Sequence, residues 1–176
     1  GDMMLFGNQY KARSPEDAIH HGVALVTEDR KRQGLLLKQN VTINTTVSSI
    51  KQLTRFGLIR LGEELKLVKK MIQQLSIKTP GPNFIVVNMS GGNQQKVILA
   101  RWLAVGTRIF ILDEPTRGID VGSKSEIYQI MADLASKGVA ILMISSELPE
   151  VMGMSDRIMV MRQGTIVKEL SRAEAS

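Results

Sequence analysis

The C-terminal half of the chain alternates short apolar runs with amphipathic segments. Residues 108–112 (RIFIL) and 139–145 (VAILMIS) are uninterrupted apolar runs, which are typical of parallel strands covered on both faces. The segment 121–138 between them has a helical pattern and ends in a glycine. This order predicts an α/β fold with two buried strands. A short helix near 147–153 and two strands joined by a Gln-Gly pair are expected to follow.

The first 33 residues predict smaller elements of the same kind. Residues 3–10 (MMLFGNQY) have apolar positions on both sides of a Gly-Asn pair, which tolerates positive φ and so predicts a hairpin. Ser14 is a good N-cap and Pro15 suits a first helical position, so we expect a short helix to begin there. Residues 22–26 (GVALV) then predict a buried strand.

From residue 34 to about residue 81 the apolar positions follow a helical period instead. The pattern is clearest in 62–77, where the apolar positions fall three and four residues apart at Leu65, Val68, Ile72 and Leu75. A Pro-Gly-Pro sequence ends this run. A helical segment is therefore inserted between the strands of an α/β core.

Composition narrows the class of protein. Hydrophobic residues make up 43% of the 176 positions, enough for a substantial core. The apolar runs are far shorter than the roughly 20 residues that cross a bilayer. The chain has no cysteine, which excludes a disulfide framework and a thiolate metal site, and its N-terminus shows no secretory pattern. A cytosolic location fits these observations.

The net charge of +6 is compatible with nucleic acid, an anionic membrane surface or phosphorylated ligands as partners. Only 4% of the residues are aromatic, so platforms for base stacking are scarce. The basic residues are also dispersed along the chain. We therefore favour a solvated basic surface over a nucleic-acid groove.

Residues 88–120 concentrate the candidate chemistry. Ser90 can cap the helix predicted near 91–105, and the pair Gly91 and Gly92 leaves the first N–H groups of that helix without side-chain cover. A helix N-terminus of this kind suits a phosphate. For a Ser-Gly-Gly sequence alone we favour ordinary helix capping over a phosphate site, but the longer run SGGNQQKV is much more specific.

The strand at 108–112 is followed by Asp113 and Glu114. A carboxylate at the C-terminal end of such a strand lies where open α/β sheets bind ligands, and it can hold Mg²⁺. The adjacent Glu114 could orient and deprotonate an attacking water. A solvated turn is the alternative, but the sequence PTRGID that follows favours the functional interpretation. The phosphate-cradling pattern GxxxxGK[ST] does not occur in the 176 residues.

These motifs resemble the nucleotide-binding domain of ATP-binding cassette (ABC) transporters. MSGGNQQ resembles the family's signature motif, RIFILD followed by Glu114 its Walker B motif, and RGID its D-loop. SPEDAI, ALVTEDRKRQGLLL and ISSELPEVMGMSDRIMVM are similar to the second ATPase half of tandem proteins that power bacterial importers of ribose, galactose or xylose. The resemblance covers nearly the whole chain.

The resemblance implies a role for each motif residue. Glu114 would be the catalytic carboxylate toward water, Asp113 would support Mg²⁺, and Asp120 would lie across the interface between two cassettes. The residues expected to contact the γ-phosphate of ATP held by the opposing cassette, or to lie beside those that do, are Ser90, Gly91, Gly92, Asn93 and Gln94.

Two positions depart from the general family. Glu28 stands where a glutamine usually touches Mg²⁺ and the attacking water, and Ser146 stands at the switch histidine. Serine cannot carry the charge of an imidazolium, so sensing of the γ-phosphate through Ser146 would be weaker. Both replacements resemble those of the second half of sugar-importer tandems. They leave open whether this half's own site hydrolyses ATP.

The resemblance implies a partial P-loop NTPase core of α/β class with an inserted α-helical subdomain, lacking the Walker A strand and helix. The core would comprise 1–33 and 106–176, and the helical subdomain 34–105. Without the phosphate loop we expect the chain alone to be inactive and to expose an apolar face of its sheet.

The implied partners are a second cassette, membrane permease subunits and, indirectly, a sugar-binding protein, with no nucleic acid. The implied location is the cytoplasmic face of the plasma membrane, where the protein would be peripheral. ATP and Mg²⁺ are the implied substrate and cofactor. A soluble cassette ATPase acting on nucleic acid or ribosomes, and a non-catalytic interaction fragment, are the alternatives.

Overall fold

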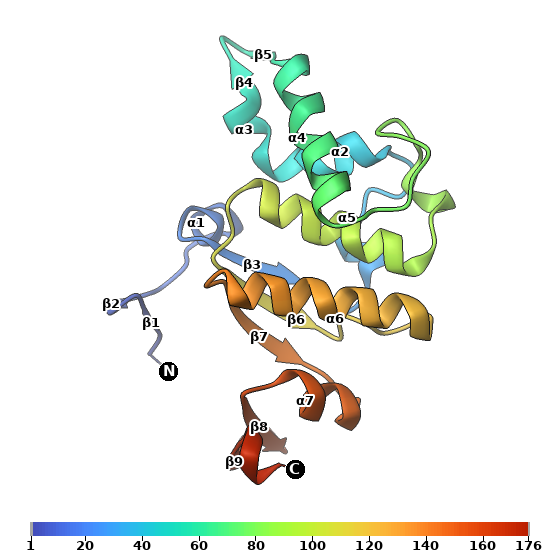
Figure 1. The fold of residues 1–176 in the computed structure, drawn as a ribbon. Helices are drawn as coiled ribbons and strands as arrows, with labels where there is room; N and C mark the ends of the chain where they lie inside the picture. The colour runs from blue at the N-terminus through green and yellow to red at the C-terminus, as the bar shows by residue number, and fades with distance from the viewer. Residues whose placement is uncertain (1, 176) are drawn as a thin grey trace.

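The computed structural model describes residues 2–175 and has a three-stranded parallel sheet at its centre. The strands lie in the order β3-β6-β7 (Figure 1), and adjacent strands pair without a register shift. Their bounds are Val23–Val26 for β3, Ile109–Asp113 for β6 and Ala140–Ile144 for β7. The strands predicted from apolar runs are thus confirmed. The last residue of β7, Ile144, lies opposite Asp113 of β6.

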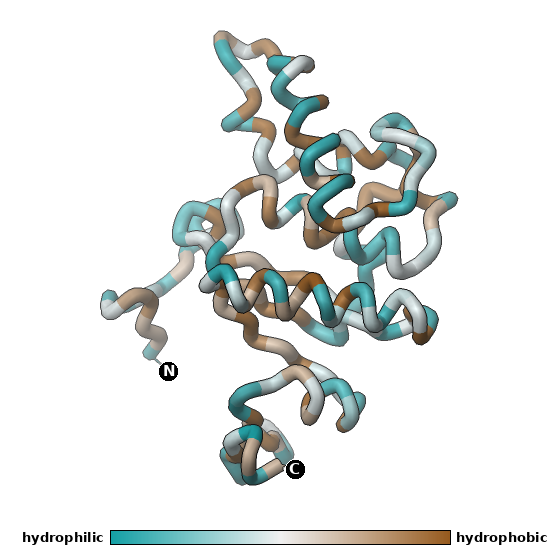
Figure 2. The backbone as a smooth tube through the Cα atoms, in the orientation of Figure 1, coloured by the Kyte–Doolittle hydropathy of each residue, from teal (hydrophilic) through white to brown (hydrophobic). Residues whose placement is uncertain are grey.

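Two long helices, α5 (Gly91–Ala104) and α6 (Val121–Ser136), pack on one face of this sheet. Val26, Phe110 and Leu112 point into that layer and are buried. On the opposite face Leu25 and Leu142 are 50% and 54% exposed, although the strands are hydrophobic in Figure 2. The prediction that both faces are covered is therefore wrong for the described residues. The separate expectation, that the chain without the phosphate loop exposes an apolar face of its sheet, is confirmed.

Residues 34–105, the predicted helical subdomain, reach the sheet through α5, and α2 and α4 lie beyond that helix (Figure 1). Within these residues α2 packs on both α4 and α5. Val68 and Leu75 are buried as predicted, but Leu65 is 42% exposed because the inner stripe of α4 runs through Glu64, Val68 and Met71. The bounds are Val41–Thr46 for α2, Ile50–Leu53 for α3 and Leu61–Gln74 for α4, with 3₁₀ turns at Val47–Ser49 and Val86–Asn88.

A short hairpin within this subdomain was not predicted. Strands β4 (Thr54–Arg55) and β5 (Leu58–Ile59) are joined by Phe56 and Gly57, both with positive φ. The helical period assigned to residues 34–81 left no place for strands there, so this hairpin was missed.

Arg101 of α5 joins three parts of this segment to one another. Its guanidinium donates to the carbonyl oxygen of Gly34 at 2.6 Å, and to the carbonyl and Oδ1 of Asn44 at 2.7 and 3.0 Å. Burial lowers the pKa of Arg101 to about 10. One buried cation thus binds the turn at Arg30–Gly34 and helix α2 to α5.

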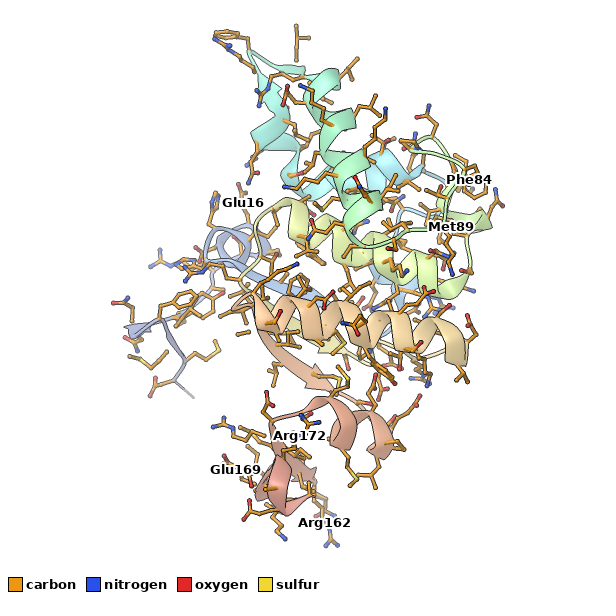
Figure 3. All side chains as sticks on the ribbon, in the orientation of Figure 1. Glu16, Phe84, Met89, Arg162, Glu169 and Arg172 are labelled. Carbon is orange, nitrogen blue, oxygen red and sulfur yellow. The ribbon has the colours of Figure 1, made fainter. Side chains whose placement is uncertain are left out.

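Hairpins lie near both ends of the chain. The C-terminal hairpin pairs β8 (Arg157–Arg162) with β9 (Thr165–Ser171), and its Arg162 and Glu169 are labelled in Figure 3. It follows helix α7 (Leu148–Met154) as predicted. No helix among residues 2–175 is long and apolar enough to cross a membrane.

The N-terminal hairpin pairs β1 (Met4–Leu5) with β2 (Asn8–Gln9), and α1 (Pro15–His20) follows. Its turn is Phe6-Gly7, one residue before the predicted Gly-Asn pair, because glycine takes the second of two positive-φ positions. Ser14 caps α1 as predicted, since its Oγ accepts from the amide of Asp17 at 3.1 Å.

Candidate functional site

Asp113 and Glu114 lie at the carboxyl end of β6, the central strand of the sheet. Asp113 alternates with the buried Leu112 and so belongs to the open face of the sheet. Glu114 has a φ of 48°, a left-handed conformation that is unfavourable for a residue with a Cβ. Its amide donates to the carbonyl oxygen of Ile144 at 2.9 Å, which helps to hold this conformation.

The structure brings Glu114 together with Ser146, the other residue predicted to be catalytic. The backbone amide of Ser146 donates to Oε1 of Glu114 at 2.8 Å. These residues are 32 positions apart and meet because β6 and β7 are parallel neighbours whose carboxyl ends coincide. The contact uses the backbone amide of Ser146, so it does not depend on the side chain at this position.

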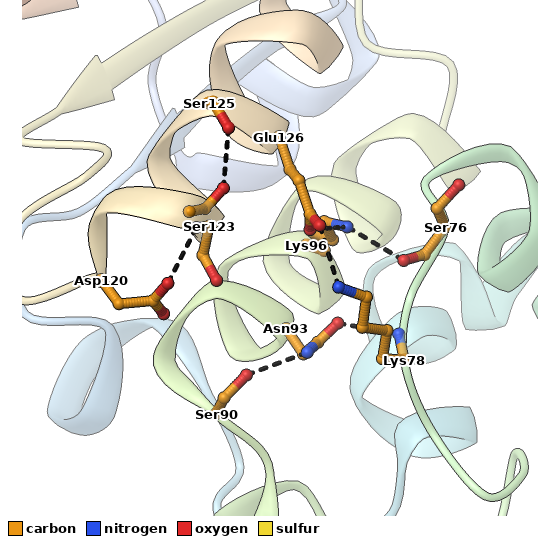
Figure 4. A network of polar contacts seen from close by, with 10 residues as sticks. Ser76, Lys78, Ser90, Asn93, Lys96, Asp120, Ser123, Ser125 and Glu126 are labelled. Atoms are coloured by element: carbon orange, nitrogen blue, oxygen red, sulfur yellow. Dashed lines mark hydrogen bonds and ion pairs between the residues drawn. The ribbon is translucent and has the colours of Figure 1, made fainter.

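The signature residues lie at the start of α5 (Figure 4). Ser90 occupies the N-cap position, but its side chain caps no amide, so that part of the prediction is wrong. Its Oγ instead accepts from Nδ2 of Asn93 at 2.9 Å, while Oδ1 of Asn93 accepts from the amide of Lys78 at 2.8 Å. The first turn of α5 therefore has no side-chain cap.

Gly91 and Gly92 allow α5 to approach its neighbours closely. A Cβ on Gly92 would lie 2.4 Å from Cβ of Ser123, which is on α6. A Cβ on Gly91 would lie 2.8 Å from Nη2 of Arg30 and 3.2 Å from the carbonyl oxygen of Gly118. The sequence pattern explained these glycines by the first amides of the helix, which they leave without side-chain cover. The packing is a second reason that the pattern alone could not show.

Gln94 does not share the surface of its neighbours. Its side chain is only 3% exposed, and Nε2 donates to the carbonyl oxygen of Val86 at 3.1 Å. The sequence analysis placed Gln94 among the nucleotide-binding residues; in the structure its side chain, at the fourth position of α5, points inward, to the turn that precedes the helix.

The loop 114–120 is bound at two places. Glu28 contacts Arg117 in the middle of the loop, and Asp120, the last residue of the loop, bonds to α6. Glu28 forms an ion pair with Arg117, and the neighbouring Arg30 donates to the carbonyl oxygens of Arg117 and Gly118 at 2.6 and 3.0 Å. Asp120 caps α6, and the hydrogen bond from the amide of Ser123 at 2.9 Å lowers its pKa. The loop 114–120 is thus held on both sides, by the segment after β3 and by α6.

An ionic network beside the signature residues was missed at the sequence level. Lys96 of α5 is 1% exposed and donates to Oε2 of Glu126 at 2.8 Å and to the carbonyl oxygen of Ser76 at 2.9 Å. Lys78 donates to Oε1 of the same Glu126 at 2.9 Å (Figure 4). Hydrogen bonds from the two lysines lower the pKa of Glu126. No spacing rule links these residues, because their elements meet only in the fold.

The carboxylate of Asp113 is suited to a magnesium ion whose other ligands are water and the phosphates of a nucleotide. Residues 2–175 contain no group of three or more His, Cys, Asp or Glu that could hold a metal by itself. In ATPases, however, Mg²⁺ keeps several waters and takes only one or two protein carboxylates, since phosphates supply other ligands. Asp113 on the open face of the sheet meets that smaller requirement.

Comparison with solved structures supports the cassette fold. The ATP-binding cassette MJ1267 of an ABC transporter, in its ADP conformation, matches 97% of this chain and 70% of its own chain, with a TM-score of 0.77 at 22% identity. The cassette MJ0796, solved as a dimer in a post-hydrolysis state with ADP and Pi, matches 98% and 73%, with a TM-score of 0.77 at 18% identity.

Curated relatives are more similar in sequence. The ribose import ATP-binding protein RbsA of Geobacillus kaustophilus is 50% identical over 94% of this chain and 34% of its own length. The xylose import ATP-binding protein XylG of the same organism is 48% identical over 100% of this chain and 35% of its own length. The chain spans about a third of the length of these relatives.

The sequence profile of the ABC transporter family matches residues 1–117, about two thirds of the chain. This match includes the signature residues and both carboxylates at the end of β6. The chain therefore belongs to the ABC transporter family.

Proposed function

We propose that this chain supplies part of an ATP-hydrolysing cassette that drives the import of a monosaccharide. The observation that carries the proposal is Glu114, a carboxylate at the carboxyl end of the central strand that is held by the amide of Ser146. The printed names of the curated relatives, which refer to import of ribose and of xylose, support the sugar class.

In the chain's own site the two carboxylates would have separate tasks. Asp113 would hold Mg²⁺, which when bound neutralises charge on the phosphates. Glu114 would orient a water for attack and accept its proton, since phosphoryl transfer asks the protein mainly for positioning and charge stabilisation. The bond from Ser146 fixes Oε1 of Glu114 and leaves Oε2 as the oxygen to face the water.

The start of α5 would serve ATP held by an opposing cassette. The absence of a side-chain cap on its first turn and the glycine pair support this role, because exposed amides at a helix N-terminus bind phosphate oxygens. The expected contacts are made by Ser90, Gly91, Gly92 and Asn93. Asp120, at the start of α6, would lie across the interface between cassettes.

The 176 residues lack the loop that would cradle the β- and γ-phosphates. We therefore expect this chain alone, given Mg-ATP, to show no saturable nucleotide binding and no turnover. Isothermal titration calorimetry and a phosphate-release assay test both statements. A dissociation constant in the micromolar range would contradict them.

The proposed partners are a second cassette, membrane permease subunits at the cytoplasmic face of the plasma membrane and, indirectly, a sugar-binding protein. The segment after Glu28 would face the permease. Purification of the full-length polypeptide from its native host tests this assignment. Recovery with a sugar permease supports it, whereas recovery with ribosomes or DNA contradicts it.

The hydrolytic role is tested by Glu114→Gln in the full-length polypeptide, paired with its permease. The amide cannot accept a proton from water, so we expect hydrolysis to stall with ATP retained between the cassettes. Asp133→Asn, a carboxylate replacement on the exposed side of α6, is the matched control. An unchanged hydrolysis rate in Glu114→Gln would remove Glu114 from this role.

A further inference from the structure

Glu150 is a buried carboxylate with no part in the site described so far. It lies on α7, is 3% exposed, and uses both of its oxygens. Oε1 accepts from the hydroxyl of Thr116 at 2.9 Å, and Oε2 accepts from the hydroxyl of Ser145 at 2.5 Å. The two hydroxyls belong to different segments, one after β6 and the other after β7.

Both segments carry a residue of the proposed hydrolytic site. Thr116 follows Glu114 by two positions, and Ser145 directly precedes Ser146. The bonds Thr116–Glu150, Glu150–Ser145 and Ser146–Glu114 therefore close a ring of contacts between the two segments.

We propose that Glu150 is a positioning residue for ATP hydrolysis, which holds the loop after β7 so that the amide of Ser146 stays on Glu114. This inference rests on the proposed function of Glu114. It assigns to Glu150 no contact with ATP or water. Its effect on the reaction passes through the place and orientation of the Glu114 carboxylate.

The burial of Glu150 makes the ring sensitive to the loss of either hydroxyl. A carboxylate is costly to remove from water unless its oxygens are hydrogen-bonded. Thr116 is itself only 1% exposed, so water cannot readily take the place of its hydroxyl. Removing either partner leaves a buried charge with half of its bonds, which the loop can relieve by moving. That motion would carry Ser146 away from Glu114.

The test uses the full-length polypeptide with its permease and compares Thr116→Val, which keeps the shape but removes the hydroxyl, with Thr116→Ser, which keeps the hydroxyl. Glu150→Gln is a second variant that keeps the volume but removes the charge. Glu147→Gln is the control, because Glu147 is nearby but pairs with Lys124 in a solvent-exposed contact of 2.6 Å.

We expect Thr116→Val and Glu150→Gln to lower kcat about 10-fold to 100-fold while KM for ATP changes less than about 2-fold, because small misplacements of a reacting group have effects of this size. Hydrogen exchange of the peptide that contains the Ser146 amide should become at least about 10-fold faster, as expected when a protecting bond opens. Thr116→Ser and Glu147→Gln should behave as the wild type.

Wild-type exchange at Ser146 in folded Thr116→Val and Glu150→Gln would overturn the proposal. A fall of kcat in Thr116→Ser equal to that in Thr116→Val would also overturn it, since the hydroxyl would then be irrelevant. Failure of the proposed function is a separate result, in which Glu114→Gln hydrolyses ATP at the normal rate. The exchange measurement distinguishes the two, because it does not depend on hydrolysis.

Discussion

The amide of Ser146 donates a 2.8 Å hydrogen bond to Oε1 of Glu114, joining two residues 32 positions apart. The resemblance to the family places Ser146 where a switch histidine is expected, and an imidazole there could carry charge. In this chain the backbone makes the contact with the carboxylate. The position can therefore bear a serine and still orient Glu114.

Replacement of Ser146 by alanine should consequently have little effect on hydrolysis by the full-length polypeptide. Alanine keeps the amide, so we expect kcat within about 3-fold of the wild type. This is less than the tenfold change in rate that corresponds to about 1.4 kcal/mol in the activation free energy. Steady-state phosphate release at saturating ATP measures it. A loss as large as that of Glu114→Gln would show that the hydroxyl of Ser146 acts in the reaction.

Gly92→Ala should destabilise the fold through a steric conflict. The new methyl group would lie 2.4 Å from Cβ of Ser123, so α5 and α6 must separate. We expect a loss of about 1–3 kcal/mol in the free energy of unfolding, typical of an overpacked core. Urea unfolding followed by circular dichroism measures the loss.

Gly122→Ala is the control for that substitution. Gly122 is also in a first helical turn, but the atom nearest to its added Cβ is Oδ1 of Asp120, 3.5 Å away. Alanine there should leave stability unchanged or raise it by up to about 1 kcal/mol, the difference in helix propensity. Equal losses in the two variants would contradict the steric explanation.

Arg101→Met should loosen the packing of α2 and of the turn at Arg30–Gly34 on α5. Methionine fills much of the volume but removes the guanidinium donor from the carbonyl oxygens of Gly34 and Asn44, while Oδ1 of Asn44 keeps only the amide of Leu36. We expect a loss of about 2–4 kcal/mol in unfolding free energy, since unsatisfied buried acceptors are costly. Arg162→Met on the exposed hairpin should change stability by less than about 0.5 kcal/mol. Similar unfolding midpoints for both would refute the bridging role.

Glu126 should make stability dependent on acidic pH. Its pKa is lowered from the usual value of 4.5 by the bonds from Lys96 and Lys78, so the folded state binds its proton less readily than the unfolded state does. The stabilisation is therefore complete above pH 4.5 and is lost as the pH falls through the lowered pKa.

Glu126→Gln should flatten this dependence and lower stability at pH 7, because the buried Lys96 loses its counter-charge. Unfolding midpoints in urea between about pH 3 and pH 7 give the two profiles. Glu169→Gln, which alters an exposed pair with Arg157, is the control and should keep the wild-type slope. A wild-type slope in Glu126→Gln would show that other carboxylates cause the acid effect.

The sequence by itself determined the elements and the chemistry at their ends. The apolar runs of β3, β6 and β7 and the helical period of α4 and α5 are local properties of the chain, so their order could be predicted. Asp113 and Glu114 were found because a carboxylate pair after a buried strand is a local signal. Strands β4 and β5 were missed because they lie inside a stretch in which only helices were predicted.

Tertiary structure alone decided which distant groups meet. Three contacts join residues 30 or more positions apart in the sequence. They are the bond of Ser146 to Glu114, the salt bridge of Lys96 with Glu126, and the bond of Thr116 to Glu150. It also decided that Gln94 points inward and that one face of the sheet is open. The physical reason is that burial and pairing depend on which elements pack together, and a linear pattern encodes the apolar faces but not their partners.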